Sequence, residues 1–226
     1  MPARKLRAQE TRQRILDSAA AVFTEKGFSQ ASLNDIAERA YVTTGAFYYH
    51  FESKDAVATA LTEESWPKTL EMIAGILDSP APGLENVIVM TFAVMDMMSR
   101  DRSHWLAFDL DYRFGQDNDS GRLSYSDRVG ILAEHVTNAL ARTELHEDTT
   151  PQQAGAAIVS HCYGLMATAL HGSAMVGGAD PGEPVRQLAD NWGILLRGIA
   201  PTESLGCYRQ FLARTAAQYE RRAEAV

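Results

Sequence analysis

The sequence predicts an all-α protein with a small three-helix head, residues 1–53, and a larger helical body, residues 54–226. Three observations support this fold class. Apolar residues recur at helical spacing along most of the chain, segments rich in Gly, Pro, Asp and Ser separate these stretches, and no stretch alternates for long enough to predict a strand. A chain of 226 residues can also bury a sizeable core without a disulfide framework.

Composition excludes several classes of protein. The chain is 46% hydrophobic and 22% charged, close to the globular average, which argues against disorder and low-complexity structure. It has two cysteines and a polar, basic N-terminus without the apolar stretch of a signal peptide, so we expect a protein of the reducing cytoplasm. The longest apolar-leaning stretch, Leu84 to Met98, falls short of the roughly 20 residues of a bilayer span, so we expect no membrane segment.

Charge is distributed unevenly between the two parts. The net charge is −8, yet residues 1–54 carry eight Lys and Arg against six Asp and Glu. Five of those eight basic residues fall within the first fourteen positions. This pattern is typical of a basic arm that binds nucleic acid, and equally of a short solvated tail.

Each head helix has its own start or stop signal. The first, Gln9–Lys26, has an apolar face and is followed by Gly27 as a C-terminal cap. Ser32 caps a short second helix that ends near residue 40, with Asp35 in its first turn. Thr43 caps a third helix of about two turns. Two short helices joined by a tight turn form a helix-turn-helix, whose second helix enters the major groove of DNA.

The third helix divides into core and contact positions. Phe47 and Phe51, four residues apart, are expected in the core. The free N–H groups at a helix start favour a phosphate, small residues allow close approach, and long polar side chains reach bases or backbone. The side chains of adjacent helical residues point about 100° apart, so we expect either Tyr48 or Tyr49 to turn inward. The predicted DNA-binding residues here are Thr43, Thr44, Gly45, Ala46, Tyr48, Tyr49 and His50.

The body is predicted to be a series of longer helices. Ser53 caps the fourth helix, Lys54 to Leu77, in which Pro67 predicts a kink near residues 63–66, the alternative being a proline tolerated in a bent helix. Further helices are predicted at 84–99, 102–115, 122–142, 151–176, 183–200 and 202–222, separated by 79–83, 115–121, 176–184 and 200–204.

Two patterns in the sequence suggest a catalytic or metal site, and neither meets the requirements of one. His161 and Cys162 are neighbours, but on a helix they diverge by about 100° and cannot pair as nucleophile and base. The acidic stretch Asp109, Asp111, Asp117 and Asp119 has some features of a calcium loop. However, Asp117-x-Asp119-x-Gly121 places the glycine one position early and Arg128 stands where the closing glutamate belongs, so we interpret the stretch as a solvated loop. We therefore expect no enzyme, no metal and no cofactor.

The segments Ile36-Ala37 and Val42-Thr43-Thr44-Gly45-Ala46-Phe47-Tyr48-Tyr49-His50-Phe51-Glu52-Ser53-Lys54 resemble the signature of the TetR family of one-component bacterial repressors. The resemblance covers about the first quarter of the chain. It implies that Lys54 contacts a DNA phosphate, with a solvated lysine as the alternative. Thr44 departs from the pattern, because the family usually carries a lysine there.

A second resemblance concerns the body. Residues 188–199 resemble a late helix of the γ-butyrolactone-receptor branch, whose members control antibiotic production in filamentous soil bacteria. Arg128 occupies the position at which that branch has a pocket tryptophan. An arginine there suits an acidic ligand, the alternative being a solvated side chain. Tyr163 occupies the position of a pocket residue that carries a hydroxyl group. A small regulator needs an apolar cavity with a few polar groups. The predicted ligand-binding residues are Met90, Trp105, Phe108, Arg128, Tyr163 and Met166, although each apolar one could be plain core.

The resemblance implies a homodimeric repressor that leaves a palindromic operator in double-stranded DNA when a small diffusible signal binds. We expect the segments 151–176 and 183–200 to form a four-helix dimer interface, the alternative being an intramolecular core. The signal is expected to be a butyrolactone- or butenolide-like autoregulator, or another apolar compound such as an antibiotic intermediate. The alternative from another class is a helical enzyme or binding protein.

Overall fold

The computed structural model describes residues 2–117, 119–171, 180 and 182–225, omitting side-chain detail at 2–4, 102, 114–125 and 169–171. Within this part of the chain all regular structure is helical, which confirms the all-α prediction. The helices are α1 (Pro2–Lys26), α2 (Leu33–Arg39), α3 (Thr44–His50), α4 (Lys54–Leu77), α5 (Gly83–Arg100), α6 (Arg102–Asp117), α7 (Asp119–Leu140), α8 (Pro151–His171), α9 (Glu183–Ile199) and α10 (Leu205–Glu224).

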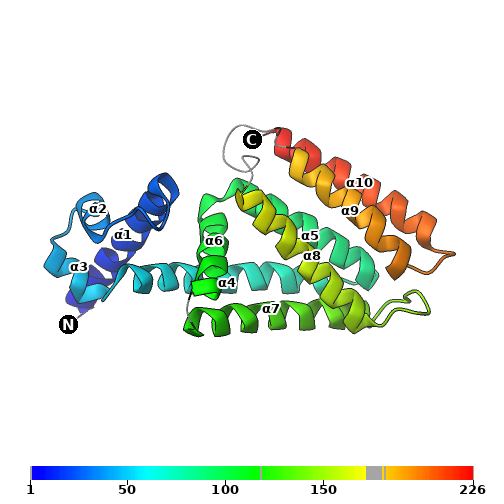
Figure 1. Cartoon of the computed structure of the whole chain (residues 1–226), viewed down its shortest axis with the longest axis horizontal. Coiled ribbons are helices and arrows are strands. Elements are labelled where there is room, and N and C mark those ends of the chain that lie inside the picture. The colour runs from blue at the N-terminus through cyan, green and yellow to red at the C-terminus, as the bar shows by residue number, and fades with distance from the viewer. Residues whose placement is uncertain (1, 118, 172–179, 181, 226) are drawn as a thin grey trace.

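The head consists of α1, α2 and α3, and α4 runs from it into the body (Figure 1). The predicted starts of α2, α3 and α4 are confirmed, because Ser32, Thr43 and Ser53 each accept a hydrogen bond from a backbone N–H of the following helix. Helix α1 begins at Pro2, earlier than the predicted Gln9. The prediction missed its first turns because they are polar and show no apolar periodicity. Helix α4 is continuous through Pro67. The kink there stays a prediction.

Several helix boundaries of the body differ from the predicted ones. The predicted loop 115–121 is shorter, because α6 extends to Asp117 and α7 begins at Asp119, with residue 118 outside the described residues. The last part of the predicted helix 151–176 and most of the separator 176–184 also lie outside them. Helix α7 ends at Leu140, two residues early, and α10 starts at Leu205 rather than at residue 202.

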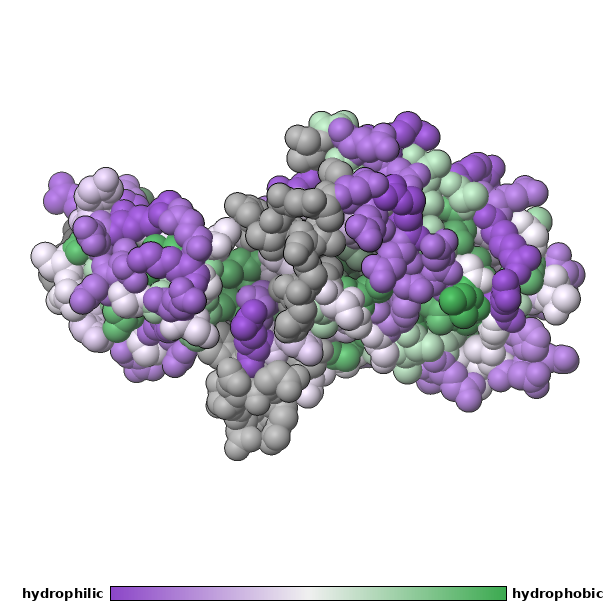
Figure 2. All heavy atoms as spheres, turned by 45° about the horizontal axis from the view of Figure 1, so that its top comes forward, coloured by the Kyte–Doolittle hydropathy of each residue, from purple (hydrophilic) through white to green (hydrophobic). Residues whose placement is uncertain are grey.

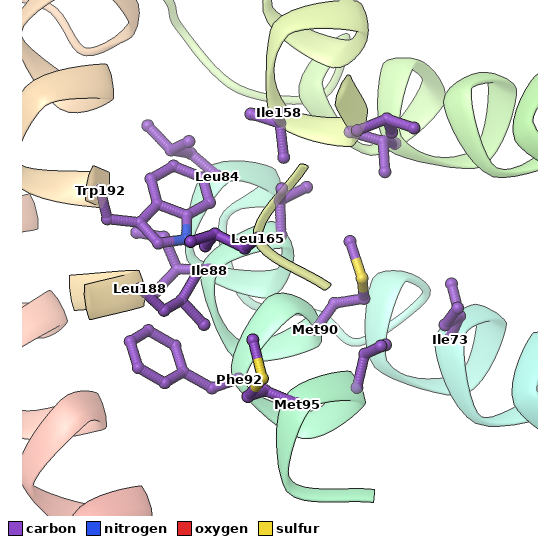
Figure 3. Close-up of a cluster of buried hydrophobic side chains, with 14 of the residues drawn as sticks. Ile73, Leu84, Ile88, Met90, Phe92, Met95, Ile158, Leu165, Leu188 and Trp192 are labelled. Atoms are coloured by element: carbon purple, nitrogen blue, oxygen red, sulfur yellow. The ribbon is translucent and has the colours of Figure 1, made fainter. Parts of the chain in front are cut away.

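The described chain buries two separate apolar clusters. One lies in the head and combines α1, α2 and α3 with the first turns of α4 and with Leu106 and Leu110 of α6. The other fills the body between α4, α5, α7, α8, α9 and α10, and it includes Phe108 of α6. Figure 3 shows Trp192 of α9 among the leucine and isoleucine side chains of this second cluster. Helix α6 therefore contributes to the head although it belongs to the body in sequence.

Figure 2 shows that hydrophilic residues cover much of the head and that hydrophilic and hydrophobic residues are mixed on the body. Among the helices of the described residues, none is both long enough and apolar enough to span a bilayer.

Candidate functional site

The helix-turn-helix starts from a fixed junction between α1 and α2. Ser32 and Asp35 form a reciprocal capping box, in which Ser32 Oγ accepts from the Asp35 N–H at 3.1 Å and Asp35 Oδ2 accepts from the Ser32 N–H at 2.9 Å. Lys26 Nζ, at the end of α1, donates to Asp35 Oδ1 at 2.7 Å. These bonds, first that of Lys26 and then those of Ser32, hold the pKa of the Asp35 carboxyl well below its ordinary value.

The turn between α2 and α3 contains a strained residue. Tyr41 has a φ of 53°, in the left-handed region that non-glycine residues rarely adopt. The Tyr41 N–H donates to the Glu38 carbonyl at 3.1 Å and the Val42 N–H donates to the Ala37 carbonyl at 3.0 Å, which is the hydrogen-bond pattern of a Schellman motif. The side chain of Tyr41 is 93% exposed, so packing does not compensate for the strain.

Helix α3 is fixed by its aromatic inner face. Phe47 and Phe51 are buried in the head, as predicted. Tyr48 and Tyr49 are 53% and 76% exposed, so the expectation that one of them turns inward is wrong. Phe47 is the one buried residue of α3, and the two residues that follow it lie on the exposed sides of this two-turn helix. His50 is half-buried, and its ring lies edge-on to that of Tyr49 at a centroid distance of 5.0 Å.

The first residues of α3 form an open surface beside these tyrosines. Thr43, Thr44 and Gly45 are exposed and Ala46 is half-buried. A Cβ added at Gly45 would meet nothing nearer than Thr43 Oγ1 at 4.0 Å. The fold therefore does not require a glycine at this position, and the space is open to an external surface.

Lys54 is half-buried and its ammonium is engaged inside the head. Its Nζ donates to the Phe28 carbonyl at 2.7 Å and to the Ala31 carbonyl at 3.0 Å, and lies 4.3 Å from the centroid of the Phe28 ring. Lys54 thus holds the loop between α1 and α2. Since an ammonium has three donors, one remains for another acceptor, and the phosphate contact stays a prediction.

Several basic residues of the head are also engaged in ion pairs. Arg12 pairs with Glu64 at 2.8 Å, and Arg39 pairs with Glu25 at 2.7 Å. Lys5 and Arg7 are exposed on the first turns of α1. The basic start of the chain is therefore part of a helix rather than a separate arm.

The body contains a cavity of about 80 Å³ enclosed by α4, α5, α6, α7, α8 and α9. Its wall is mostly apolar and includes four methionines, Met90, Met95, Met98 and Met166. Ile73, Met90 and Met95 of this wall are labelled in Figure 3. Methionine side chains are unbranched and adaptable, so the cavity can change its shape around a guest.

Five of the six residues predicted to bind a ligand line this cavity, namely Met90, Phe108, Arg128, Tyr163 and Met166. The sixth, Trp105, does not line it. The Trp105 ring stacks on Phe108 at a centroid distance of 6.1 Å and packs against the body core. Trp105 is therefore one of the predicted apolar residues that belong to the core instead, the alternative stated for each of them.

The polar residues of the wall include an ion pair that sequence reasoning missed. Arg128 Nη1 of α7 donates to Asp111 Oδ1 of α6, and the guanidinium lies 5.9 Å from the centroid of the Trp66 ring of α4. The interpretation of the acidic stretch as a solvated loop is wrong, because Asp109, Asp111 and Asp117 belong to α6 and Asp119 begins α7. Burial outweighs the attraction of Arg128 and raises the pKa of the Asp111 carboxyl.

The segments predicted to dimerise are partly occupied within one chain. Leu188, Trp192 and Leu196 of α9 are buried in the body core, as the alternative interpretation held for these residues. Ile194, on the other side of α9, is 68% exposed and borders a groove between α8 and α9. Ala157 of α8 lines the same groove, so a face with small and apolar residues remains open.

Comparisons with known proteins agree with this architecture. The model of bacterial regulatory proteins of the tetR family matches residues 15–61. The A-factor receptor protein of Streptomyces griseus is 45% identical over 62 residues, which are 27% of this chain and 22% of that protein. An HTH-type transcriptional regulator of Pseudomonas putida, TtgW, is 36% identical over 107 residues, 45% of this chain and 75% of that protein.

Solved structures extend the likeness to the body. A crystal structure of a gamma-butyrolactone receptor, an ArpA-like protein, has a TM-score of 0.68 at 23% identity and covers 94% of this chain and 99% of its own. CprB from Streptomyces coelicolor, in complex with its operator sequence, has a TM-score of 0.66 at 24% identity with the same coverage. At these identities the likeness shows the fold.

The alignment with the first curated relatives is partial. The chain spans 22% of the A-factor receptor protein and 47% of a probable acrEF/envCD operon repressor from Escherichia coli, which is 35% identical over 107 residues, 44% of this chain. The match to TtgW extends over three quarters of that regulator, and the family model falls on the helix-turn-helix. By these matches and its fold, the chain belongs to the TetR family of bacterial regulatory proteins.

Proposed function

We propose that this protein is a cytoplasmic transcriptional repressor that binds a palindromic operator in double-stranded DNA as a homodimer and leaves it when a small apolar signal enters the body cavity. The signal we propose is a butyrolactone- or butenolide-like autoregulator that controls antibiotic production. The printed names of the relatives support this choice, since they include an A-factor receptor protein and gamma-butyrolactone receptors.

The exposed surface of α3 supports the proposed DNA contact. Tyr48 and Tyr49 project from a helix whose other side is fixed by Phe47 and Phe51. Gly45 leaves room for a backbone to approach the start of the helix. Phosphate contacts would position this surface on the duplex and base contacts would read its sequence.

Homodimerisation is proposed through the open face of α8 and α9. One head offers few contacts, and a dimer doubles them on two half-sites about 34 Å apart. Ile194 and Ala157 border the groove on this face, where a second copy would bury them. A dimer whose heads move away from that spacing loses simultaneous contact with both half-sites.

The observation that carries the proposal is the position of α6 between the head and the cavity. Leu106 and Leu110 belong to the head cluster, whereas Phe108 and Asp111 of the same helix line the cavity. We expect a ligand that displaces Phe108 to shift α6, against which the head packs. A coupling free energy of about 1–3 kcal/mol would change operator affinity by roughly 5- to 150-fold.

A gel-shift titration with the DNA upstream of the protein's own gene tests the proposal, because repressors of this kind commonly control themselves. We expect retention of the fragment, release on addition of a γ-lactone with an alkyl chain, and loss of retention in Tyr48→Ala and Tyr49→Ala. Gln210→Ala, an exposed change on α10, is the matched control. Failure to retain any such fragment at low salt would contradict the proposed repressor.

One observation favours a different ligand within the same function. Arg128 lines the cavity where a neutral lactone offers no charge to match it. This favours an acidic ligand, the alternative that Arg128 already suggested in the sequence.

A further inference from the structure

The cavity wall contains one buried pair of opposite charges drawn from two helices. The side chains of Arg128 on α7 and Asp111 on α6 are 12% and 14% exposed, and they are hydrogen-bonded to each other. Trp66 of α4 lies beside the guanidinium. All three residues line the cavity, so the pair faces the space in which a guest would sit.

A buried ion pair of this kind contributes little to the free energy of unfolding. Removing two charges from water costs free energy that their attraction repays only with good geometry and further hydrogen bonds. Among the described residues, Asp111 is the one hydrogen-bond partner of Arg128, although a guanidinium has five N–H donors in a planar fork. The fork therefore retains donors suited to a second carboxylate.

We propose that Arg128 is the recognition residue for the carboxylate of an apolar acid, and that this ligand takes the guanidinium over from Asp111. The proposal rests on the proposed function, and it specifies the class of ligand that the same cavity accepts. The aliphatic or aromatic remainder of the acid would lie against the methionines and Phe108.

Charge balance adds a proton to this exchange. If the ligand enters as an anion while Asp111 stays ionised, two carboxylates share one guanidinium and a negative charge remains uncompensated in an apolar cavity. The balanced event is uptake of one proton from solution by the Asp111 carboxyl as the ligand carboxylate pairs with Arg128. Burial already favours the protonated form of Asp111, since it raises the pKa of this carboxyl.

The other titratable groups at the cavity are accounted for. His104 of α6 lines the wall, and its Nδ1 lies 2.9 Å from Asp101 Oδ2, which occupies that nitrogen. On α8, burial raises the pKa of the Cys162 thiol to about 12, so it stays neutral, and Tyr163 is a phenol. The described residues of α4, α5 and α9 that line the cavity are uncharged.

The test uses carboxylic acids and their neutral counterparts. Hexanoate, octanoate, decanoate and dodecanoate are each compared with the matching methyl ester, and γ-decalactone serves as a neutral lactone. Binding to the full-length protein is measured by isothermal titration calorimetry from about pH 6 to pH 8, in two buffers of different ionisation enthalpy. The buffer pair counts the protons taken up with each ligand.

We expect at least one acid to bind about tenfold or more tightly than its ester, with close to one proton taken up. Its affinity should fall with rising pH, by about tenfold per unit once the pH exceeds the pKa of the free Asp111 carboxyl. Asp111→Asn should bind the acid more tightly and without this pH dependence, because the exchange then needs no proton. A purely structural ion pair would give the opposite result, with weaker binding in this variant.

Arg128→Met should lose at least tenfold in acid affinity while its ester affinity stays near that of the wild type. Because this variant leaves Asp111 unpaired and could unfold, the double variant Asp111→Leu with Arg128→Met removes both charges. It should keep the helical circular dichroism spectrum and still bind ester but not acid. His104→Gln is the control for the other titrating group and should change neither preference nor proton uptake.

The inference is overturned if no acid in the series binds more tightly than its ester, if γ-decalactone binds more tightly than every acid, or if Arg128→Met keeps the acid preference. Operator release is measured separately by gel shift. An acid that binds with one proton but leaves the operator complex intact would support the assignment of Arg128 and contradict the proposed switch. The two failures are therefore distinguishable.

Discussion

Trp192 donates its indole N–H to Thr91 Oγ1 at 2.9 Å, and both residues are buried, so this bond joins α9 to α5 across 101 positions of sequence. Thr91 Oγ1 in turn donates to the Ile88 carbonyl at 2.8 Å. Because Thr91 also lines the cavity, the bond fixes one part of the wall to the body core.

Trp192→Phe should lower the free energy of unfolding by about 2–4 kcal/mol, because it removes this hydrogen bond and leaves a cavity where the indole was fully buried. Urea denaturation followed by circular dichroism measures the change. Trp105→Phe, at a partly buried position, is the matched control and should cost less. Equal losses in the two variants would show that the bond to Thr91 is unimportant.

Gly45→Ala should separate folding from DNA binding. A methyl group at this position has free space in the structure and removes backbone entropy from the unfolded chain, so stability should stay constant or rise by up to about 1 kcal/mol. On the proposed DNA interface the same methyl would hinder close approach, and operator affinity should fall about tenfold or more. Gel shift and thermal denaturation of one preparation test both parts. Unchanged operator affinity would remove Gly45 from the interface.

Tyr41→Gly should stabilise the head by about 1 kcal/mol. The left-handed backbone at this position costs an L-residue roughly 1–2 kcal/mol and a glycine much less, while the greater freedom of glycine in the unfolded chain cancels part of the gain. The exposed phenol contributes little packing that could be lost. Chemical denaturation gives the magnitude, and Tyr41→Ala, which keeps the strain, should show no such gain.

Lys54→Gln should destabilise the head by about 1–3 kcal/mol, because two charge-assisted bonds to the Phe28 and Ala31 carbonyls are weakened and the contact with the Phe28 ring is lost. The melting temperature measures this effect. The salt dependence of operator affinity provides a second readout. If the remaining donor of Lys54 contacts a phosphate, the slope of log affinity against log salt concentration should be about one unit shallower in the variant than in the wild type. An unchanged melting temperature would contradict the internal role of this lysine.

Acid should weaken the junction between α1 and α2. The folded head holds the pKa of Asp35 below its ordinary value, chiefly through the bond from Lys26, so the unfolded chain binds a proton more readily than the folded one. The stabilisation is complete above the unfolded pKa near 3.8 and is lost as the pH falls through the lower folded value. Melting temperatures from about pH 6 down to pH 2 should therefore fall less steeply for Asp35→Asn than for the wild type.

The parts of the fold that the sequence predicted best are those with local signals. Ser32, Thr43 and Ser53 accept bonds from residues only three positions ahead, so each helix start is visible within a few letters. The pair of Asp111 and Arg128 has no such signal. Seventeen positions separate the two residues, and their contact depends on how α6 crosses α7, which periodicity does not specify.

Most of the cavity wall that was predicted from the sequence is present, since five of the six predicted residues line the cavity, and Trp105 is the exception. Helical spacing places Trp105 and Phe108 on one side of α6, yet only the latter reaches the cavity. Similarly, the apolar stripe of α9 was apparent in the sequence, whereas the choice between a core and a dimer interface depends on which partner helix lies opposite.

The two faces of α6 set a rule for building chimeric regulators from this chain. A head severed after residue 53 would leave behind Val57 of α4 and Leu110 of α6, both fully enclosed by head residues in the intact molecule. The excised piece would expose the apolar surface that these residues cover, and it would aggregate. Grafting a foreign operator specificity onto this sensor therefore calls for exchanging α3 alone, or for transplanting the head together with the matching positions of α4 and α6.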